Sequence, residues 1–490
     1  MQKKGKMKGI VSSVIIALLF LGLFGFAFTL QTARAQSGTI YIMPDGSITP
    51  FTANITSLDN VTYTFTGNNY LPIVVQRSNI IIDGRGYKVQ APGYYTIGFS
   101  LSDVSNVTIK NTAVINGGSA YTIGFSLEGV SNVTIKNTAV TYSGYGIVLG
   151  SSSGNVLSGN NVTANVFGGI WLNYSSRNVL SGNNVSVDYQ GITLDYSSDN
   201  NTLSDNIAIA NAIYGIWLNY GSDNNILSSN TIYHGGNGIE LNSSSGNVLS
   251  GNNDVANDLW GIWLSYSSGN MIFHNDFNIN IQQNHVSGGS TDVWDDGYPS
   301  GGNYWSNYTG IDQKSGPYQN LTGSDGIGDT PYIIGSNNTD RYPLMAPFST
   351  FNVGTWNNTP YNVSIVTNST ISNFSFDQAA KTLTFNVTGT SGTVGFCRIA
   401  IPLSLMSCID LADWTVTING SPPSPLSFSI TVNGNYTYIY LTYHYSTDEV
   451  QITSTSDVPE FQPLFFLPLF MIATLLAALV LKRKRNVGTQ

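Results

Sequence analysis

The sequence predicts an all-β protein whose main body is a parallel β-helix, a solenoid of short strands, followed by a small β-sandwich. A motif returns about every 23 residues, and its apolar residues alternate with a variable one. Only 10% of the 490 residues are charged, whereas Asn, Ser, Thr, Gly and Tyr are abundant. A period this short indicates a solenoid, in which each repeat buries its apolar side only by stacking on its neighbours.

The repeat has two halves, Gly-Ile-x-Leu and Asn-x-Leu/Ile-x-x-Asn. The first half begins at Gly146, Gly169, Gly191, Gly215, Gly238 and Gly261. The second half spans Asn155–Asn160, Asn178–Asn183, Asn201–Asn206, Asn225–Asn230, Asn247–Asn252 and Asn270–Asn275. Looser copies begin at Asn79, Asn106 and Asn132, so we expect nine coils.

The motif favours strands and tight turns. Alternation in Gly-Ile-Trp-Leu has the period of a strand, so Ile170 and Leu172 are expected to point inward and Trp171 outward. Gly, Asn and Ser fill the gaps, as turns require. Leucine-rich repeats have a similar length, but their consensus with its helical return does not occur here. We expect two or three short strands per coil, with asparagines stacked in ladders at the corners.

Composition divides the chain into six segments. We predict a signal peptide at 1–35, an N-terminal β region capping the helix at 36–78, the β-helix repeats at 79–284, a Gly/Asp/Tyr-rich C-terminal cap at 285–348, a β-sandwich stalk at 350–455, and a C-terminal transmembrane anchor or sorting signal at 459–485. Lysines precede the apolar run Ile10–Leu30, and four basic residues follow the apolar run Leu464–Leu481. This charge asymmetry predicts a protein on the outer face of the membrane, anchored at its C-terminus.

Charge excludes one class of partner. Residues 36–463, which lead up to the second apolar run, include 10 basic and 28 acidic residues, a net charge of −18. An acidic surface repels nucleic acid, so no nucleic-acid partner is expected. Nineteen Asn-x-Ser/Thr sequons are acceptors for glycans outside the cell. Cys397 and Cys408 either form a disulfide there or stay free.

The cap carries two distinctive motifs. They read Gly302-Asn303-Tyr304-Trp305-Ser306 and Asp325-Gly326-Ile327-Gly328-Asp329-Thr330-Pro331-Tyr332. With the preceding coils they resemble the NosD-like, right-handed β-helix proteins common on archaeal cell surfaces, over roughly residues 70–348. The resemblance implies a right-handed helix and groups the chain with carbohydrate-binding proteins and sugar hydrolases. Residues 350–455 resemble a domain often found after such helices, and Pro459-Glu460-Phe461 resembles the PEF-type sorting signals cut by archaeosortases.

The name of that family also implies copper, which clusters of His, Met or Cys bind. The histidines are His234, His274, His285 and His444. If a copper site exists, His274 and His285 are the pair that the end of the helix brings near each other. The alternative is that all four histidines are isolated turn residues.

A calcium site is predicted in the cap. Asp325, Asp329 and the carbonyl group of Ile327 offer hard oxygen ligands, with Asp312 or Asp340 available to complete the set. The alternative is ordinary turn chemistry, because Asp-Gly pairs are common in turns. This chain also lacks the longer acidic run that precedes the motif in many relatives, which puts a metal role in doubt.

The variable position of Gly-Ile-x-Leu carries an aromatic pattern. Along the helix it reads Val148, Trp171, Thr193, Trp217, Glu240 and Trp263. The indoles fall on alternate rungs, about 10 Å apart, close to a disaccharide repeat. Tyrosines stand three residues further on, at Tyr174, Tyr196, Tyr220 and Tyr266. We predict a face that binds an extended polysaccharide, external or from the envelope; the alternative is aromatic packing that only stabilises the sheet.

Catalysis on such a face requires clustered carboxylates. The candidates are Asp195 and Glu240, two rungs and about 10 Å apart, which is too far for a retaining glycosidase pair and at the limit for an inverting one. Asp195 is expected to share a ladder with Asn173 and Asn219. A polysaccharide lyase, hydrolase or epimerase is therefore the second hypothesis. A purely structural surface or adhesion protein is the third, and a NosD-like periplasmic copper-binding protein is the fourth.

Overall fold

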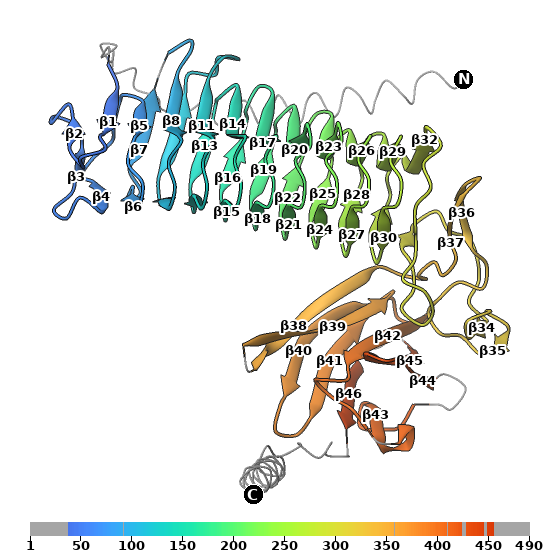
Figure 1. Cartoon of the computed structure of the whole chain (residues 1–490). Coiled ribbons are helices and arrows are strands. Elements are labelled where there is room, and N and C mark those ends of the chain that lie inside the picture. The colour runs from blue at the N-terminus through green and yellow to red at the C-terminus, as the bar shows by residue number, and fades with distance from the viewer. Residues whose placement is uncertain are drawn as a thin grey trace, which may run out of the picture. The chain divides into compact units, whose positions relative to one another are not determined.

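The computed structural model of the chain describes residues 38–91, 93–356, 358–408, 410–423, 428–444 and 448–454. In these ranges the regular structure is β apart from one 3-10 turn, η1 (Leu411–Asp413). The strands form three long, mainly parallel sheets, followed by antiparallel sheets (Figure 1). The prediction of an all-β solenoid is confirmed.

Both terminal segments, the predicted signal peptide and the predicted C-terminal anchor, lie outside the described residues. Within the described ranges, no helix has the length and apolar character needed to cross a membrane.

Sheet A is the first face of the solenoid. It consists, in spatial order, of β2 (Ile48–Thr49), β1 (Ile40–Ile42), β5 (Ile73–Val75), β8 (Ile97–Ser102), β11 (Ile123–Glu128), β14 (Tyr145–Gly150), β17 (Gly168–Asn173), β20 (Gln190–Asp195), β23 (Tyr214–Asn219), β26 (Asn237–Asn242), β29 (Trp260–Ser265) and β32 (Gln282–Ser287). All of them pair in parallel except β2, which is antiparallel to β1.

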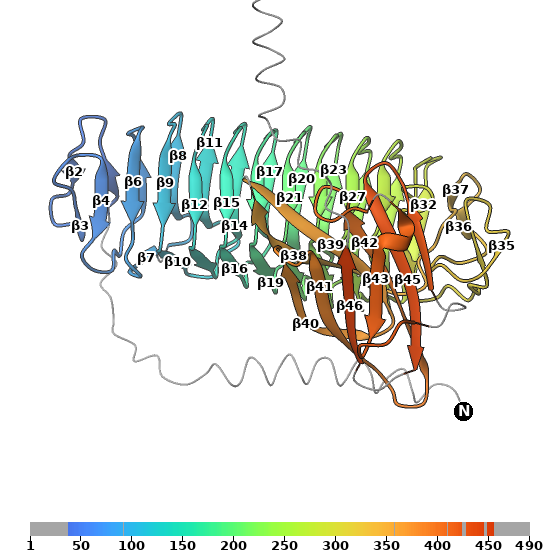
Figure 2. The ribbon, with the colours of Figure 1, turned by 90° about the horizontal axis from the view of Figure 1, so that it is seen from below.

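Sheets B and C form the other two faces. Sheet B consists of β3 (Ile55–Thr56), β4 (Thr62–Phe65), β6 (Ile80–Asp83), β9 (Val107–Lys110), β12 (Thr134–Lys136), β15 (Val156–Ser158), β18 (Val179–Ser181), β21 (Thr202–Ser204), β24 (Ile226–Ser228), β27 (Val248–Ser250) and β30 (Met271–Phe273). Sheet C consists of β7 (Lys88–Ala91), β10 (Ala113–Asn116), β13 (Ala139–Thr141), β16 (Asn161–Thr163), β19 (Asn184–Ser186), β22 (Ile207–Ile209), β25 (Thr231–Tyr233), β28 (Asn253–Val255), β31 (Asp276–Asn278) and β33 (Tyr304–Trp305). Each central coil thus contributes one strand to each sheet, and the coils follow one another along the helix (Figure 2).

The stack is longer than the nine coils that the motif predicts. At its N-terminal end β1 pairs in parallel with β5, and β5 with β8, although neither segment carries the motif. At the other end β32 and β33 add further parallel strands from within the predicted cap. These segments keep the inward apolar alternation, since Ile40, Ile42, Ile73 and Val75 are all buried, and this alternation is what stacking requires.

The core explains the glycine and the aliphatic residues of Gly-Ile-x-Leu. The Ile and Leu of each copy are buried without exposure, as at Ile170 and Leu172. The glycine packs where sheets C and A meet. A Cβ atom on Gly146 would lie 2.3 Å from Cγ1 of Val162 and 2.4 Å from the carbonyl oxygen of Gly169 on the next coil. Close packing between coils therefore excludes a side chain at this position.

Buried asparagine ladders run along the corners, as predicted: one between sheets A and B, one between sheets B and C, and a less regular one between sheets C and A, where Asp188 takes one rung. In each, the Oδ1 atom of one rung accepts hydrogen bonds from the backbone N–H and the Nδ2 atom of the rung before it. Asn160, for example, donates to Oδ1 of Asn183 from its backbone nitrogen at 3.1 Å and from Nδ2 at 2.9 Å. Nδ2 of Asn160 also donates to the carbonyl oxygen of Ile135, at 3.0 Å. The ladders therefore satisfy the backbone groups that the sharp corners leave unpaired.

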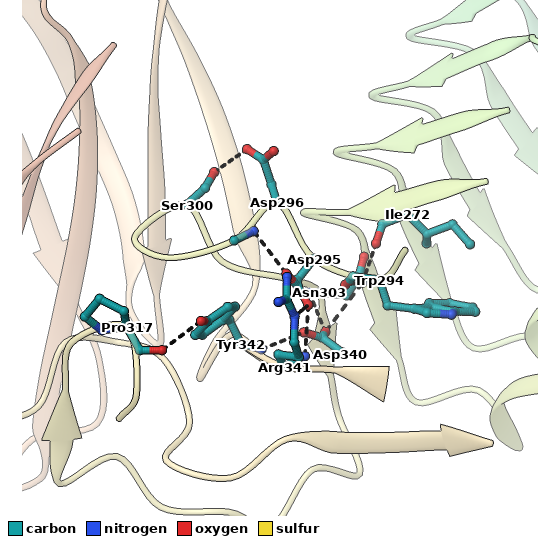
Figure 3. A network of polar contacts seen from close by, with 11 residues as sticks. Ile272, Trp294, Asp295, Asp296, Ser300, Asn303, Pro317, Asp340, Arg341 and Tyr342 are labelled. Carbon is teal, nitrogen blue, oxygen red and sulfur yellow. Dashed lines mark hydrogen bonds and ion pairs between the residues drawn. The ribbon is translucent and has the colours of Figure 1, made fainter. Parts of the chain in front are cut away.

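The hydrogen bonds of a ladder all run one way, from the donors of one rung to the acceptor of the next. The last rung therefore needs an acceptor beyond it. The corner between sheets B and C ends at Asn303, whose backbone N–H donates to Oδ2 of Asp340 at 2.8 Å (Figure 3). The same carboxylate accepts the indole N–H of Trp305 at 2.9 Å. Beside it, Arg341 forms a bidentate ion pair with Asp295. The Gly-Asn-Tyr-Trp motif of the cap thus closes the ladder.

The rest of the cap forms small hairpins, and the residues after it form two antiparallel sheets. The hairpins are β34 (Lys314–Ser315) with β35 (Leu321–Thr322) and β36 (Tyr332–Gly335) with β37 (Asn338–Asp340). One sheet has the order β38 (Phe348–Trp356), β39 (Thr359–Thr367), β42 (Val394–Pro402), β45 (Tyr436–His444), β44 (Phe428–Val432). The other has the order β40 (Thr370–Asp377), β41 (Thr382–Thr388), β46 (Asp448–Ser454), β43 (Trp414–Ile418). Residues of both sheets share one apolar core, as in a β-sandwich.

The two cysteines are free. Cys397 is buried in β42, and its Sγ atom lies 3.3 Å from Oγ1 of Thr367. Burial raises the pKa of the Cys397 thiol to about 11. Of the two alternatives that the sequence leaves open, the structure supports unpaired thiols.

Candidate functional site

The outer face of sheet A gathers most of the candidate residues. Strand register places the variable position of every copy in one column, which reads Val148, Trp171, Thr193, Trp217, Glu240, Trp263 and His285. The indoles therefore stand on alternate rungs, about 10 Å apart along the helix. This geometry follows from the parallel register, because each strand pairs residue for residue with the next.

A second aromatic column lies beside the first, and sequence reasoning missed it. It is formed by the residue before the motif glycine, which is Tyr145, Tyr214 or Trp260 in the aromatic copies. The ring of Tyr145 stacks on Trp171 with centroids 5.0 Å apart, and Tyr214 stacks on Trp217 at 4.6 Å. The signal was present as an aromatic residue directly before Gly-Ile-x-Leu. Each indole thus has a ring partner.

The predicted tyrosines border this face at the corner between sheets A and B. We call Tyr174, Tyr196, Tyr220 and Tyr266 the tyrosine rim. All four are exposed and adopt positive φ angles of 47–51°, which turn the chain out of the strand. The rings of Tyr174 and Tyr196 stack at 5.5 Å, and those of Tyr196 and Tyr220 at 4.9 Å. The second aromatic ladder that the sequence predicts is formed across three neighbouring coils.

The opposite border, at the corner between sheets C and A, is also apolar. Its exposed side chains, here called the apolar rim, are Tyr142, Phe167, Tyr189, Leu259 and Ile281. Phe167, Tyr189 and Leu259 each stand two residues before a motif glycine, so a periodic signal was present, but a reading based on strand alternation did not extend to these loop positions. The outer face of sheet A therefore lies between two borders of exposed aromatic and aliphatic side chains, an arrangement typical of interaction surfaces.

The indoles are half-buried. This exposure lies between the two alternatives from the sequence, which are an open face that binds polysaccharide and aromatic packing that only stabilises the sheet. They shelter the residues of the intervening rungs, because Thr193 between Trp171 and Trp217 is only 3% exposed and Glu240 between Trp217 and Trp263 only 5%. The indole N–H groups of Trp217, Trp260 and Trp263 have no hydrogen-bond partner within the described part of the protein. Packing thus uses part of each ring and leaves part of its surface available.

The structure does not bring Asp195 and Glu240 together as a catalytic pair. Glu240 lies in the column of Thr193, whereas Asp195 lies two residues further along β20 and two rungs away. Their Cα atoms are therefore roughly 12 Å apart, and their side chains belong to different columns of the face. Asn237 donates to Oε2 of Glu240 at 2.7 Å, and Asn219 donates to Oδ1 of Asp195 at 3.3 Å. Asp195 thus shares a ladder with Asn219, as predicted.

Burial sets the protonation of both carboxyl groups. It raises the pKa of Glu240 to about 7, against the opposing hydrogen bond from Asn237. It also raises the pKa of Asp195, against hydrogen bonds from the backbone of Tyr196 and from Asn219. Their charge on this face is therefore weaker than that of exposed carboxylates near neutral pH.

The loop predicted to bind calcium uses its carboxylates in turns. Asp329 accepts the backbone N–H groups of Gln313 and Lys314, and Asp325 accepts that of Ile327. Ile327 itself is buried without exposure. In the described ranges no three His, Cys, Asp or Glu side chains converge to hold a metal ion. The structure thus gives the predicted site of Asp325, Asp329 and Ile327 no support.

The histidines do not fit copper. His274 follows β30, stacks on Phe348 at 4.4 Å and contacts the carbonyl oxygen of Ser300. Burial lowers its pKa to about 4. His285 belongs to β32 and contacts the rings of Trp260 and Trp263. These two imidazoles serve separate packing sites, and no soft ligand set forms around either within the described residues.

Two family models match the coils. The model described as periplasmic copper-binding protein (NosD) matches residues 165–310, and the model described as right-handed β-helix region matches residues 73–232. No functionally curated protein matches the chain.

Several solved structures are distantly similar. A mutant of the periplasmic alginate epimerase AlgG is 20% identical over 51% of this chain and 72% of that chain, with a TM-score of 0.38. The A-module of the Azotobacter vinelandii mannuronan C-5 epimerase AlgE6 is 15% identical over 52% of this chain and 91% of that one, with a TM-score of 0.31. The Dettilon tailspike protein is 14% identical over 85% and 93%, with a TM-score of 0.29. The matched family models and the parallel stack of coils together identify the chain as a right-handed β-helix repeat protein.

Proposed function

We propose that the protein binds a polysaccharide through the outer face of sheet A. The observation that carries this proposal is the column of indoles on alternate rungs, each with a ring partner and none fully buried. Aromatic rings offer flat apolar surfaces, and the C–H faces of pyranose rings pack on such surfaces. The tyrosine rim and the apolar rim extend this surface on both sides.

The proposed place of action is the cell surface. It is supported by the predicted terminal segments, 1–35 and 459–485, and by the net charge of −18 over residues 36–463. The matched NosD model is described as periplasmic, which also favours a location outside the cytoplasm. In this proposal the β-sandwich serves as a stalk that holds the β-helix away from the membrane.

Binding, rather than catalysis, is proposed because the carboxyl groups on the face are too far apart. Asp195 and Glu240 are separated by two rungs and each is engaged by an asparagine amide. No Lys or Arg occupies an outward position of the described strands β14–β32 to act as a base. The face thus offers stacking and hydrogen bonding without a catalytic constellation.

The test is the triple variant Trp171→Ala, Trp217→Ala, Trp263→Ala in the full-length protein, screened on a polysaccharide array beside the wild type. Each lost ring contact costs about 1 kcal/mol, so affinity is expected to fall about 100-fold or more. The matched control is Val179→Ala, Ile226→Ala, Met271→Ala, which removes exposed apolar side chains from sheet B on the same three coils. The control should bind like the wild type.

Two results would contradict the proposal. One is unchanged polysaccharide binding by the triple Trp variant. The other is a wild-type protein that binds no polysaccharide at all, which would favour the structural hypothesis with the indoles as packing. Circular dichroism of both variants checks that the β-helix is intact.

A further inference from the structure

We propose that the polysaccharide held by the outer face of sheet A is electrically neutral and lies along the helix axis, across the strands. The inference rests on the proposed function and names its substrate class. The neutrality of the ligand is inferred from the side chains that this face presents and from the charged side chains that it lacks.

The face lacks cations. Between Lys136 and Lys314 the sequence contains a single Lys or Arg, which is Arg177. Arg177 is exposed at the corner that leads to sheet B, where its backbone N–H donates to the carbonyl oxygen of Asp199. A uronate or sulfated polymer brings a negative charge with each charged sugar, and recognition of such groups uses Arg or Lys. Along this face those anions would be desolvated without a partner, which is costly.

The groups that are present are neutral hydrogen-bonding groups. The amide oxygens of Asn173, Asn219 and Asn237, all outward on sheet A, have no partner within the described residues. The same holds for the indole N–H groups of Trp217, Trp260 and Trp263. These atoms have almost no solvent exposure, so they do not contact the polymer themselves, but they add no ionic partner for a charged sugar on this face.

A cationic amino-sugar polymer is disfavoured for a different reason. The carboxyl groups on the central coils of the face are Asp195 and Glu240, and both are buried under neighbouring side chains. Each already accepts an asparagine amide. A polycation would therefore meet no exposed carboxylate on the central strands of sheet A, and it would lose its own hydration there without forming an ion pair.

The direction of the chain follows from the register. Trp171, Trp217 and Trp263 line up perpendicular to the strands, with Thr193 and Glu240 between them. A polymer stretched along this column meets an indole about every 10 Å, so an extended chain meets one at every second sugar. A polymer lying parallel to a strand would contact only one coil.

The experiment measures the affinity of the full-length protein for three soluble polymers of similar length, by calorimetry: glucomannan as the neutral probe, alginate as the polyuronate and chitosan as the polycation. We expect glucomannan to bind at least about 10-fold more tightly than either charged polymer. Its affinity should change less than about twofold between roughly 50 and 500 mM salt, because no ion pair contributes.

The outcomes separate this inference from the proposed function. Tighter binding of alginate or chitosan that is lost in the triple Trp variant would overturn neutrality while supporting the polysaccharide-binding face. A steep loss of glucomannan affinity with salt would likewise overturn neutrality. Binding of no polymer would contradict the proposed function itself, and with it this inference.

Discussion

Replacing Asn206 by alanine should destabilise the β-helix by about 3–6 kcal/mol. Asn206 is buried in the middle of the ladder between sheets B and C. Its Oδ1 atom accepts from the backbone nitrogen of Asn183 at 3.0 Å and from Nδ2 of Asn183 at 2.9 Å. Its Nδ2 atom donates to the carbonyl oxygen of Leu180 at 2.9 Å and to Oδ1 of Asn230 at 3.0 Å. Alanine leaves the buried backbone N–H of Asn183 without its partner, which costs about 1–3 kcal/mol, and it removes one hydrogen bond from each of the other three groups, at about 1 kcal/mol each.

Denaturant unfolding followed by intrinsic tryptophan fluorescence measures this effect as a lower midpoint. The control is Asn253→Ala, an exposed outward position on β28, which should change the free energy of unfolding by no more than about 0.5 kcal/mol. Equal effects of the two substitutions would show that the ladder does not hold the coils together.

Replacing Asp188 by asparagine should stabilise the protein at neutral and basic pH. Asp188 takes an asparagine position in the ladder between sheets C and A, where its Oδ1 atom accepts two bonds from Asn165 and its Oδ2 atom has no partner among the described residues. Burial raises the pKa of Asp188 to about 8, from an ordinary value of 3.8. An asparagine instead donates to Oδ1 of Asn211, as the ladder does elsewhere.

The sign of the pH dependence follows from this raised pKa. The folded chain binds a proton that the unfolded chain releases between about pH 4 and pH 8, so the stability contributed by Asp188 falls as pH rises through that window. Asp188→Asn should remove this part of the slope, with a gain on the order of 2–5 kcal/mol at pH 8 and little change at pH 4.

Thermal unfolding of the wild type and of Asp188→Asn across this pH range provides the measurement. The exposed Asp258→Asn variant serves as the control, which should keep the wild-type slope. An Asp188→Asn protein with an undiminished slope, or one less stable than the wild type at pH 8, would contradict this assignment.

The repeat made the fold predictable. In one copy of the repeat, Ile170 and Leu172 point inward, Trp171 points outward and the asparagines lie at the corners. Because the coils stack in register, the same assignment holds at the equivalent positions of all the other copies. The predicted column of indoles and the partnership of Asp195 with Asn219 followed from the same periodicity. The sequence placed β1 and β5 in a β region that caps the helix and not in the stack itself, because they keep the apolar alternation without the motif.

The parts of the site that depend on non-periodic contacts were not predictable. Stacking of Tyr214 on Trp217 joins two positions three residues apart on one strand, which simple alternation would place on opposite faces. The apolar rim lies in loops outside the strand alternation, although Phe167, Tyr189 and Leu259 recur two residues before the motif glycine. In the cap, an aspartate such as Asp329 can bind calcium or accept hydrogen bonds from the backbone N–H groups of a turn. The sequence alone did not distinguish these two roles.

The central claim is that the indole column forms one extended binding surface. Its most direct test is the affinity of the full-length protein for neutral oligosaccharides of increasing length. Trp171 and Trp263 are four rungs apart, about 19 Å. Affinity should rise with length until the oligosaccharide spans that distance and then level off. An affinity that is the same for a disaccharide and for a chain spanning all three indoles would contradict the account.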